Sequence, residues 1–339
     1  MKCSIGNILS LQRGYDLTKE EMEGGNIPVV GSNGIIGYHN VFNVKKPVIT
    51  LGRSGTVGIP HLYEENCWVH NTALFVADFK GNNPYYLYYL LQVININQVA
   101  TSTGVPTLNR NFVYPLKIQF ERDLNKQNEI ASLLYLIDMQ IKRNNDMVQK
   151  LQVLTHDSFD YFSKNNDCTN TVTLKDIIIE KDKSPIQVNN VEESSGDIPF
   201  FTSGETILYT DKSISSGFNI FLSTGGNAKV QSYYGDVSYS TDTWCITAKN
   251  DLQYYLYGYL KHIESQMDKL YFHGTGLKHL QKPIFLKSVI TIPNDEKLKK
   301  FNEIVGPIYS QISKIEQSNV KLQRIKNQLL PLLINQQLG

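Results

Sequence analysis

The chain has 339 residues, which is long enough for two domains of ordinary size. Its formal net charge of +1 gives no overall basic signal, so a nucleic-acid binder would have to gather its Lys and Arg on one face. The four cysteines lie far apart and are expected to be reduced, buried thiols rather than metal ligands. The polar start and the lack of a long apolar run predict a soluble, cytoplasmic protein.

The first part of the chain is predicted to be a globule of many short strands with one or two helices. β-branched runs at 27–30 and 47–51 each end in a Gly-rich turn that permits positive φ. The strongest strand signal covers 67–77, and a Tyr- and Leu-rich helix over 84–93 begins with a proline, which suits its first turn. A last strand over 116–120 closes the globule.

A long helix is predicted next, over 127–162. Its apolar residues recur at steps of four and three, and an average period of about 3.5 residues calls for a left-handed coiled-coil partner. The predicted seam has one polar position and consists of Ile130, Leu134, Ile137, Ile141, Asn144, Val148 and Leu151. A solvated run at 163–167 is taken as the boundary of the first half of the chain.

The same seam recurs near the C-terminus, with Ser318 at the position that corresponds to Asn144. Gly306-Pro307 predicts a kink or a new start, and Pro331 a further end or bend. The secure coiled-coil part is therefore 308–329. The predicted seam residues are Ile304, Ile308, Gln311, Ile315, Ser318, Leu322, Ile325 and Leu329. The natural partner of the first long helix is the second long helix of the same chain.

The segments before the two helices repeat as well, at a nearly constant spacing that drifts by a few residues. The matching pairs include Ile27 with Ile198, Leu51 with Leu222, Gly55 with Gly226, Thr72 with Thr243 and Asn128 with Asn302. The sequence therefore predicts a duplication with an α+β fold, in the order globule, long helix, globule, long helix. The predicted parts are 1–123, 124–165, 166–295 and 296–339.

No catalytic site is predicted. Asn83-Pro84-Tyr85 is similar to a loop of adenine methyltransferases, but it has one proline and starts a helix. The glycines of 31–37 favour a hairpin over a phosphate-binding loop, and Asp295-Glu296-Lys297 favours a charged first helical turn over a nuclease motif. The seven histidines have no HxxxH or HxH spacing, so no metal site is predicted either.

Polar loop residues remain as candidate DNA contacts, because Arg and Lys suit guanine edges, Asn and Gln suit adenine, and the others suit phosphates. Each alone is more often just a solvated turn residue. The candidates of the first half are Arg13, Ser32, Asn33, Arg53, Ser54, Asn71, Thr72, Asn109 and Arg110. Those of the second half are Ser203, Lys212, Ser213, Asn227, Lys229, Gln231, Thr241, Lys278 and His279. Paired positions differ, as Arg53 and Thr224 do, which favours two ligands bound by one fold.

With these features the chain resembles the specificity (S) subunit of type I restriction-modification systems. The resemblance rests on the runs at 27–38 and 51–58, the Gly-x-x-x-Leu loops at 104–108 and 276–280, and the Asn-Glu-Ile at 128–130. The duplication supports this resemblance further, and the resemblance covers essentially the whole chain.

The resemblance implies two target-recognition domains, separated by two helices that pack as an antiparallel coiled coil, and no catalytic centre. Each domain would bind one half of a bipartite double-stranded DNA target through the major groove. The helices would bind two methyltransferase (M) subunits, which carry S-adenosylmethionine and methylate adenine N6. Restriction (R) motor-nuclease subunits can join to cleave unmodified DNA. A divergent second copy with shorter strands, and the Gly306-Pro307 break, depart from the family pattern.

The helix length agrees with a bipartite target. About 36 helical residues at about 1.5 Å each form a rod of about 54 Å, against about 34–36 Å for one turn of DNA. Two short blocks with a fixed, unread gap are therefore expected. A nearly neutral chain also suits a protein whose partner subunits supply much of the affinity for DNA phosphates. The main alternative is a two-module coiled-coil scaffold that binds proteins or glycans. A second alternative is a catalytic fusion, such as a methyltransferase itself, and the missing adenosylmethionine loop speaks against it.

Overall fold

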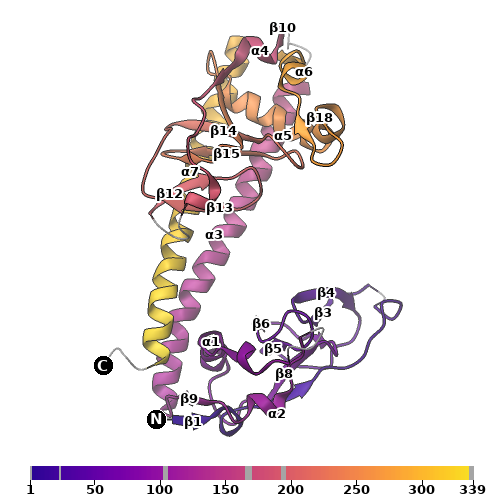
Figure 1. Ribbon diagram of the computed structural model, residues 1–339, viewed down its shortest axis with the longest axis vertical. Helices are drawn as coiled ribbons and strands as arrows, with labels where there is room; N and C mark the ends of the chain where they lie inside the picture. The colour runs from indigo at the N-terminus through magenta and orange to yellow at the C-terminus, as the bar shows by residue number, and fades with distance from the viewer. Residues whose placement is uncertain (1, 23, 102–105, 165–169, 192–195, 336–339) are drawn as a thin grey trace. The chain divides into compact units, whose positions relative to one another are not determined.

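The computed structural model describes residues 2–22, 24–101, 106–164, 170–191 and 196–335. The chain divides into two compact units, one formed by 1–140 with 322–339 and the other by 141–321. Each unit holds one globule and a part of each long helix, α3 (Leu124–Lys164) and α7 (Asp295–Ile334) (Figure 1). Within the described residues no helix is long and apolar enough to cross a membrane. The predicted boundary at 165/166 and Gly104 of the first Gly-x-x-x-Leu loop lie outside the described residues.

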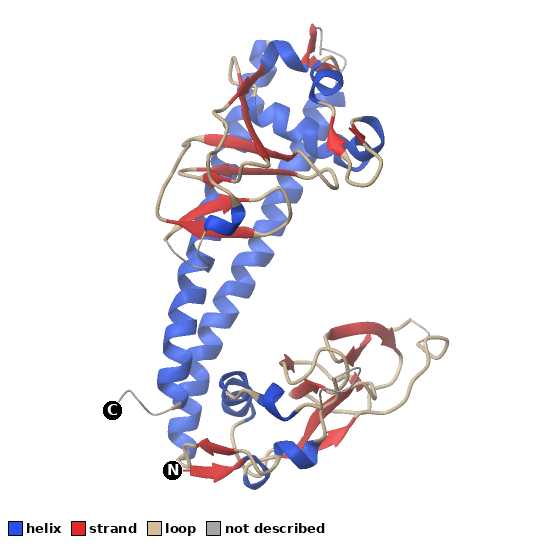
Figure 2. Ribbon diagram, viewed as in Figure 1, coloured by secondary structure: helices blue, strands red, loops and turns tan. Residues whose placement is uncertain are grey.

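The globule of the first unit mixes short strands and helices (Figure 2). Its elements are β1 (Lys2–Ser4), η1 (Ile5–Asn7), β2 (Ser10–Arg13), β3 (Ile27–Gly31), β4 (Gly34–His39), β5 (Val48–Gly52), β6 (Pro60–Tyr63), β7 (Trp68–Val69), β8 (Ala73–Asp78), α1 (Pro84–Val93), η2 (Ile96–Val99), α2 (Arg110–Val113) and β9 (Lys117–Gln119). Its sheets have the orders β2-β8-β5-β6, β4-β3-β7 and β1-β9, and β3 runs parallel to β7.

The four-stranded sheet of this globule is buried on both faces, because successive side chains of a strand point to opposite sides. Leu51 of β5 and Leu74 of β8 face the core that contains α1 and its Leu87. Val48 of β5 and Phe75 of β8, which point to the opposite side, face a second core on the side of the three-stranded sheet. The globule therefore has three layers: helix, four-stranded sheet and three-stranded sheet.

The elements of the second unit follow the same order, with an additional pair of short strands, β18 and β19. They are β10 (Asn170–Thr173), α4 (Leu174–Ile177), β11 (Ile178–Glu180), η3 (Val188–Asn190), β12 (Ile198–Phe201), β13 (Ile207–Thr210), β14 (Phe218–Ser223), β15 (Val230–Tyr234), β16 (Ser238–Tyr239), β17 (Thr243–Ala248), α5 (Gln253–Leu270), β18 (Phe272–His273), β19 (His279–Leu280), α6 (Lys282–Leu286) and β20 (Val289–Ile292). The sheet orders β11-β17-β14-β15, β13-β12-β16 and β10-β20 match those of the first globule strand for strand. The predicted duplication is confirmed.

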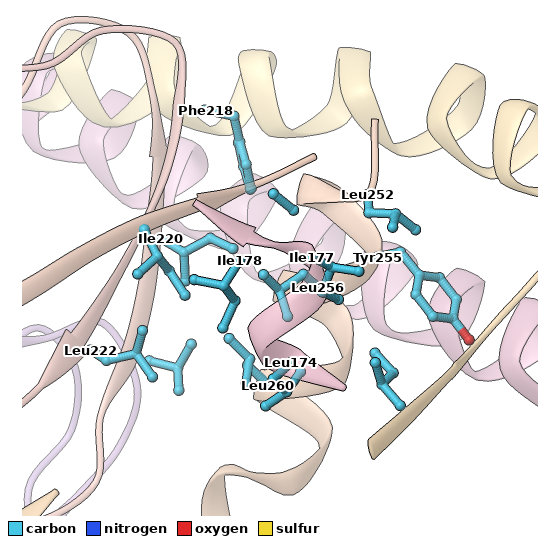
Figure 3. Close-up of a cluster of buried hydrophobic side chains, with 14 of the residues drawn as sticks. Leu174, Ile177, Ile178, Phe218, Ile220, Leu222, Leu252, Tyr255, Leu256 and Leu260 are labelled. Carbon is cyan, nitrogen blue, oxygen red and sulfur yellow. The ribbon is translucent and has the colours of Figure 1, made fainter. Parts of the chain in front are cut away.

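The core of the second unit follows the same alternation along β14. Ile220 and Leu222 belong to the same buried core as Tyr255 and Leu256 of α5, and Figure 3 labels all four. Phe221, between them in sequence, faces the three-stranded sheet and its own core. The two globules are thus built on the same plan with different side chains.

Three expectations about the strands and helices need correction. The predicted strand 67–77 is two strands, β7 and β8, because the chain turns between them at 70–72. The strands of the second copy are not uniformly shorter, since β14 has six residues against five in β5, whereas β12 has four against five in β3 and β13 has four against six in β4. The Tyr-rich helix of the second copy has 18 residues where 254–263 was predicted, against 10 in the first copy.

Helix α7 does not restart at Gly306-Pro307 and does not end at Pro331, because it is helical without interruption from Asp295 to Ile334. Gly306 has a packing role. A Cβ atom built there would lie 3.2 Å from the ring of Tyr254, so the missing side chain lets the ring of α5 approach the helix. The glycine therefore reflects close contact between helices and does not mark a break.

The seam of α3 is buried or half-buried along its predicted length, with Leu134 fully buried. The prediction for the seam of α7 is correct at four of its eight positions. Its predicted residues Ile308, Ile315, Leu322 and Leu329 are half-buried. Its other predicted residues, Ile304, Gln311, Ser318 and Ile325, are exposed, and the residues that follow each of them, Val305, Ile312, Asn319 and Lys326, take their place.

The polar layer of the coiled coil shows the same shift of one residue. Asn144 Nδ2 donates to Oδ1 of Asn319 at 2.7 Å, and Asn319 Nδ2 donates to Oδ1 of Asn145 at 2.8 Å. Ser318 was therefore the wrong residue for the partner of Asn144. An Asn layer of this kind fixes the register of a coiled coil, because a slipped pairing would bury amides against apolar side chains.

Lys326 is buried at the seam because it neutralises Asp138 of α3. Its Nζ donates to both carboxylate oxygens of Asp138, at 2.7 and 2.9 Å, and Tyr89 of α1 donates its hydroxyl to the same carboxylate at 2.8 Å. This network joins the first globule to both long helices within the first unit.

The start of each long helix is attached to its globule at matching positions. Asn83 Nδ2 donates to Oδ1 of Asn128 at 2.7 Å in the first unit, and Asn302 Nδ2 donates to the carbonyl of Asp251 at 2.7 Å in the second. The residue before each Asn is fully buried. It is Gln127 in α3, hydrogen-bonded to three groups, and Phe301 in α7, packed against aromatic rings.

Glu316 of α7 is expected to make the stability of the second unit depend on pH. It lines a cavity of about 380 Å³ with Tyr257 and Tyr309, and burial raises the pKa of its carboxyl to about 7. Between about pH 4.3 and 7 the unfolded chain releases this proton before the folded chain does, so stability falls as pH rises and stays lower above pH 7.

The variant Glu316→Gln removes this effect. We expect it to be more stable than the natural chain at pH 8 by about 1–2 kcal/mol, a value discounted for the partial exposure of the side chain, and equal to it below about pH 4. Urea unfolding at pH 4, 6 and 8 measures this. The exposed Glu303→Gln serves as control. Parallel pH profiles of the natural chain and Glu316→Gln would contradict the expectation.

Candidate nucleic-acid interface

Three loops of the first globule meet at one edge of its sheets. The hydroxyl of Ser32, after β3, donates to the carbonyl of Ser54 at 2.6 Å and to that of Thr72 at 2.8 Å. Arg53, after β5, donates Nη1 to the carbonyl of Asn71 at 3.4 Å. The structure therefore brings together five predicted candidates from the turns that follow β3, β5 and β7.

The second globule builds the corresponding edge with equivalent bonds. Thr224, which corresponds to Arg53, donates its hydroxyl to the carbonyl of Asp242, which corresponds to Asn71, at 2.7 Å. The turn after β14 also joins the segment of Lys278, because Gly226 N donates to the carbonyl of Lys278 at 2.9 Å. In the first globule the equivalent bond runs from Gly55 N to the carbonyl of Pro106 at 3.2 Å.

Glycine is required at this turn in both copies. Gly55 has φ +83° and Gly226 has φ +80°, a conformation that side chains with a Cβ rarely adopt. The exposed Asn227 follows directly, and the exposed Lys278 and His279 lie beside it. We name these two surfaces loop edge 1 (residues 32–33, 53–56 and 71–72) and loop edge 2 (residues 203–204, 224–227, 241–242 and 278–279).

Several candidates of the first globule have structural roles. Asn109 caps α2 by accepting a hydrogen bond from Asn111 N, and Arg110 donates Nη1 to the carbonyl of Leu11 at 3.0 Å. Arg13 pairs with Asp16 at 3.4 Å, and the amide of Asn71 also donates to Asp16. Asn33 is exposed in the turn after β3.

Four candidates of the second globule do not belong to loop edge 2. Lys212 and Ser213 lie on the connection before β14, at the opposite end of that strand from Asn227, and Ser213 donates to the carbonyl of Ser215 at 2.8 Å. Lys229 pairs with Glu205 at 3.1 Å, and with Gln231 it lines the cavity next to α3 and α7. Ser203 and Thr241 are half-buried in the loop edge itself.

A polar hollow beside loop edge 2, lined by three lysines and by the carboxylates of Glu180, Asp182 and Asp242, was missed by the sequence analysis. Lys181, Lys183 and Lys282 line it together with Thr224 and Thr241, in a volume of about 310 Å³. The ammonium of Lys282 lies 4.2 Å from the centroid of the Trp244 ring and 3.4 Å from Glu180 Oε2. The alternation Lys181-Asp182-Lys183 was the available signal, but only folding brings Lys282 to it.

The cysteines of the described chain are not exposed on the loop edges. Cys3, Cys67 and Cys245 are buried and free, as expected. Burial raises the pKa of both the Cys67 and the Cys245 thiol to about 12, so both stay protonated and unreactive.

The duplication agrees with the comparison to known families. A model of the type I restriction modification DNA specificity domain matches the chain twice, over 1–152 and 166–326. The chain belongs to this family. Each match contains one globule and a large part of the long helix that follows it. A DNA specificity domain therefore corresponds to one copy of the repeat.

Solved structures of this family's proteins resemble the chain over nearly its whole length. The S subunit of a type I restriction-modification system from M. genitalium has a TM-score of 0.73 at 17% identity, over 98% of this chain and 96% of that one. The HsdS subunit from Thermoanaerobacter tengcongensis has a TM-score of 0.34 at 14% identity, over 99% and 96%. The first of these shows that the specificity-domain fold is shared. No curated protein sequence matches the chain.

Proposed function

We propose that the chain recognises a bipartite double-stranded DNA target, with loop edge 1 on one half and loop edge 2 on the other, and directs N6-adenine methylation by partner subunits. The observation that carries the proposal is that the two edges are built by equivalent hydrogen bonds but carry different side chains. Arg53 and Thr224 occupy one position, and Thr56 and Asn227 another. A shared frame with different donors and acceptors suits two different short base sequences.

A phosphate contact is proposed to come from a lysine of loop edge 2. Lys278 is exposed beside the Gly226 turn, and Lys181, Lys183 and Lys282 line the neighbouring hollow. Glu180, Asp182 and Asp242 line the same hollow, so Lys278, which is not part of it, is the lysine proposed to bind the DNA backbone in a chain whose net charge is only +1.

The M subunits are proposed to bind the exposed face of α3. Met147, Val153, Leu154 and Tyr161 are 48–66% exposed on this helix, which is unusual for apolar side chains beside a well-packed seam. S-adenosylmethionine would be carried by those subunits, and R subunits would join the same assembly for restriction.

Sequencing of genomic DNA with detection of modified bases tests the proposal. Cells that express the chain with an M subunit should carry N6-methyladenine in a bipartite motif, and cells with the M subunit alone should lack it. Modification that does not depend on the chain would contradict the proposal. Binding of the purified chain to proteins or glycans without binding to duplex DNA would favour the scaffold alternative.

Lys278, beside the turn that follows β14, and Lys212, on the connection that precedes β14, give a matched test of the interface. We expect Lys278→Ala to weaken binding of the chain to duplex DNA and to reduce the slope of log affinity against log salt by about 1, as loss of one phosphate contact does. Lys212→Ala should change neither. Affinity measured by fluorescence anisotropy from 50 to 200 mM salt distinguishes them, and equal effects would contradict the placement of the interface.

A further inference from the structure

Two histidines and an aspartate from different helices of the second unit lie together. His156 and Asp160 are one turn apart on α3, so they project from the same face. His262 comes from α5, which lies beside α3 (Figure 1). Its Nδ1 is 3.4 Å from Asp160 Oδ1, and its ring stacks on that of His156 with centroids 6.2 Å apart at 23°.

The spacing of these groups suits a transition-metal ion. One ligand atom from each residue can be chosen so that all three lie within 4.8 Å of one another. Ligands of tetrahedral Zn²⁺, bound at about 2.0–2.2 Å, lie about 3.3 Å apart. Small changes of side-chain rotamer close the difference, and both imidazoles are exposed and free to make them.

Only one of the two carboxylate oxygens of Asp160 accepts a hydrogen bond from the described residues. Its Oδ2 accepts a hydrogen bond from Lys164 at 2.7 Å, which orients the group. Its Oδ1 is shielded from solvent and, among the described residues, accepts no hydrogen bond. A buried acceptor of this kind costs free energy unless a cation or a donor meets it.

The helices are held at this distance by close packing beside the cluster. Phe159 lies against Gly258 of α5, where an added Cβ would come within 2.6 Å of its ring, and its ring centroid is 5.9 Å from that of His262. The backbone on both sides is therefore fixed, while the exposed imidazoles of His156 and His262 lie beside the half-buried Asp160.

We propose that His156, Asp160 and His262 bind a divalent transition-metal ion of the Zn²⁺ class. Two imidazole nitrogens and one carboxylate oxygen are the donor set of many three-residue zinc sites, and they do not favour Mg²⁺, which prefers oxygen ligands. The ion joins α5 of the second globule to α3 and so fixes that globule on the long helix. The proposal does not depend on the function in DNA recognition.

Calorimetric titration of the full chain, first stripped with a chelator, with Zn²⁺ alone tests the site. We expect one equivalent to bind and the melting temperature to rise by several degrees, with no effect of Mg²⁺. His262→Ala and Asp160→Asn should each abolish both effects. His273→Ala, which removes an exposed histidine of β18 in the same unit, should leave both unchanged.

The result can overturn the proposal in either of two ways. A natural chain that binds no stoichiometric Zn²⁺ excludes the site directly, whatever the variants do. Binding that persists in both His262→Ala and Asp160→Asn would place the ion elsewhere. Co²⁺ offers a second readout on the natural chain, because a four-coordinate site gives strong visible absorption that a weakly held, fully hydrated ion lacks.

Discussion

Under the proposed function, deleting one heptad from each long helix should shorten the unread gap of the DNA target by about three base pairs and leave both half-sites unchanged. Seven helical residues rise about 10.5 Å, and base pairs are stacked about 3.4 Å apart. The matched deletions are 141–147 in α3 and 316–322 in α7. They remove the Asn144–Asn319 layer as a unit, and the heptads on either side then join in register.

The measurement is the methylated motif in cells that express the shortened chain with its M subunit. Deletion of 141–147 from α3 alone is the control, because it leaves the seam of α7 without its partners and should abolish methylation. An unchanged gap after the matched deletion would contradict the idea that the helices set the spacing. A change in the half-sites would contradict the assignment of base recognition to the loop edges.

Replacing Phe301 by Gln should cost about 3–5 kcal/mol of unfolding free energy, the range for deleting a large buried aromatic side chain. Phe301 is fully buried, with its ring 5.6 Å from that of Phe162 and 5.7 Å from that of Tyr255. Gln is native at the matching position 127, where Asn82, Asn83 and Glu121 supply its partners. The aromatic rings around Phe301 provide no hydrogen-bond partners for a buried amide. The cost of desolvating the Gln amide therefore adds to the loss of unfolding free energy.

Ile304→Gln is the matched control on the same helix. Ile304 was expected to lie in the seam but is 46% exposed, so its replacement should change stability by no more than about 0.5 kcal/mol. Equilibrium urea unfolding of the two variants and the natural chain gives both values. If Ile304→Gln loses as much unfolding free energy as Phe301→Gln, Ile304 lies in the seam, as the sequence predicted.

The architecture could be predicted because the sequence contains two copies of the same pattern. The match of Leu51 with Leu222 and Gly55 with Gly226 indicated a duplication, and both pairs occupy equivalent positions in β5 and β14 and in the turns that follow. The helix over 84–93 was correct at both ends, since Pro84 and the cap Asn83 are local signals. Local patterns and repetition together determine element type and order.

Details that depend on contacts between distant residues could not be predicted. The seam of α7 has neighbouring choices at each turn, such as Ile304 and Val305, and period alone does not select between them. Hydropathy assigns Lys326 to the surface, and only Asp138 explains its burial. In the same way, the polar turn residues gave no sign that Lys212 lies at the opposite end of β14 from Asn227.

Each globule begins and ends in a single antiparallel ribbon. The first starts in β1, which pairs with β9 immediately before α3, and the second starts in β10, which pairs with β20 immediately before α7. The chain therefore enters and leaves a globule side by side, and a different globule with the same ribbon could be inserted without altering the helices. Under the proposed function each half of the DNA target is encoded by an exchangeable cassette, and a single recombination event between related genes would change one half-site and retain the other.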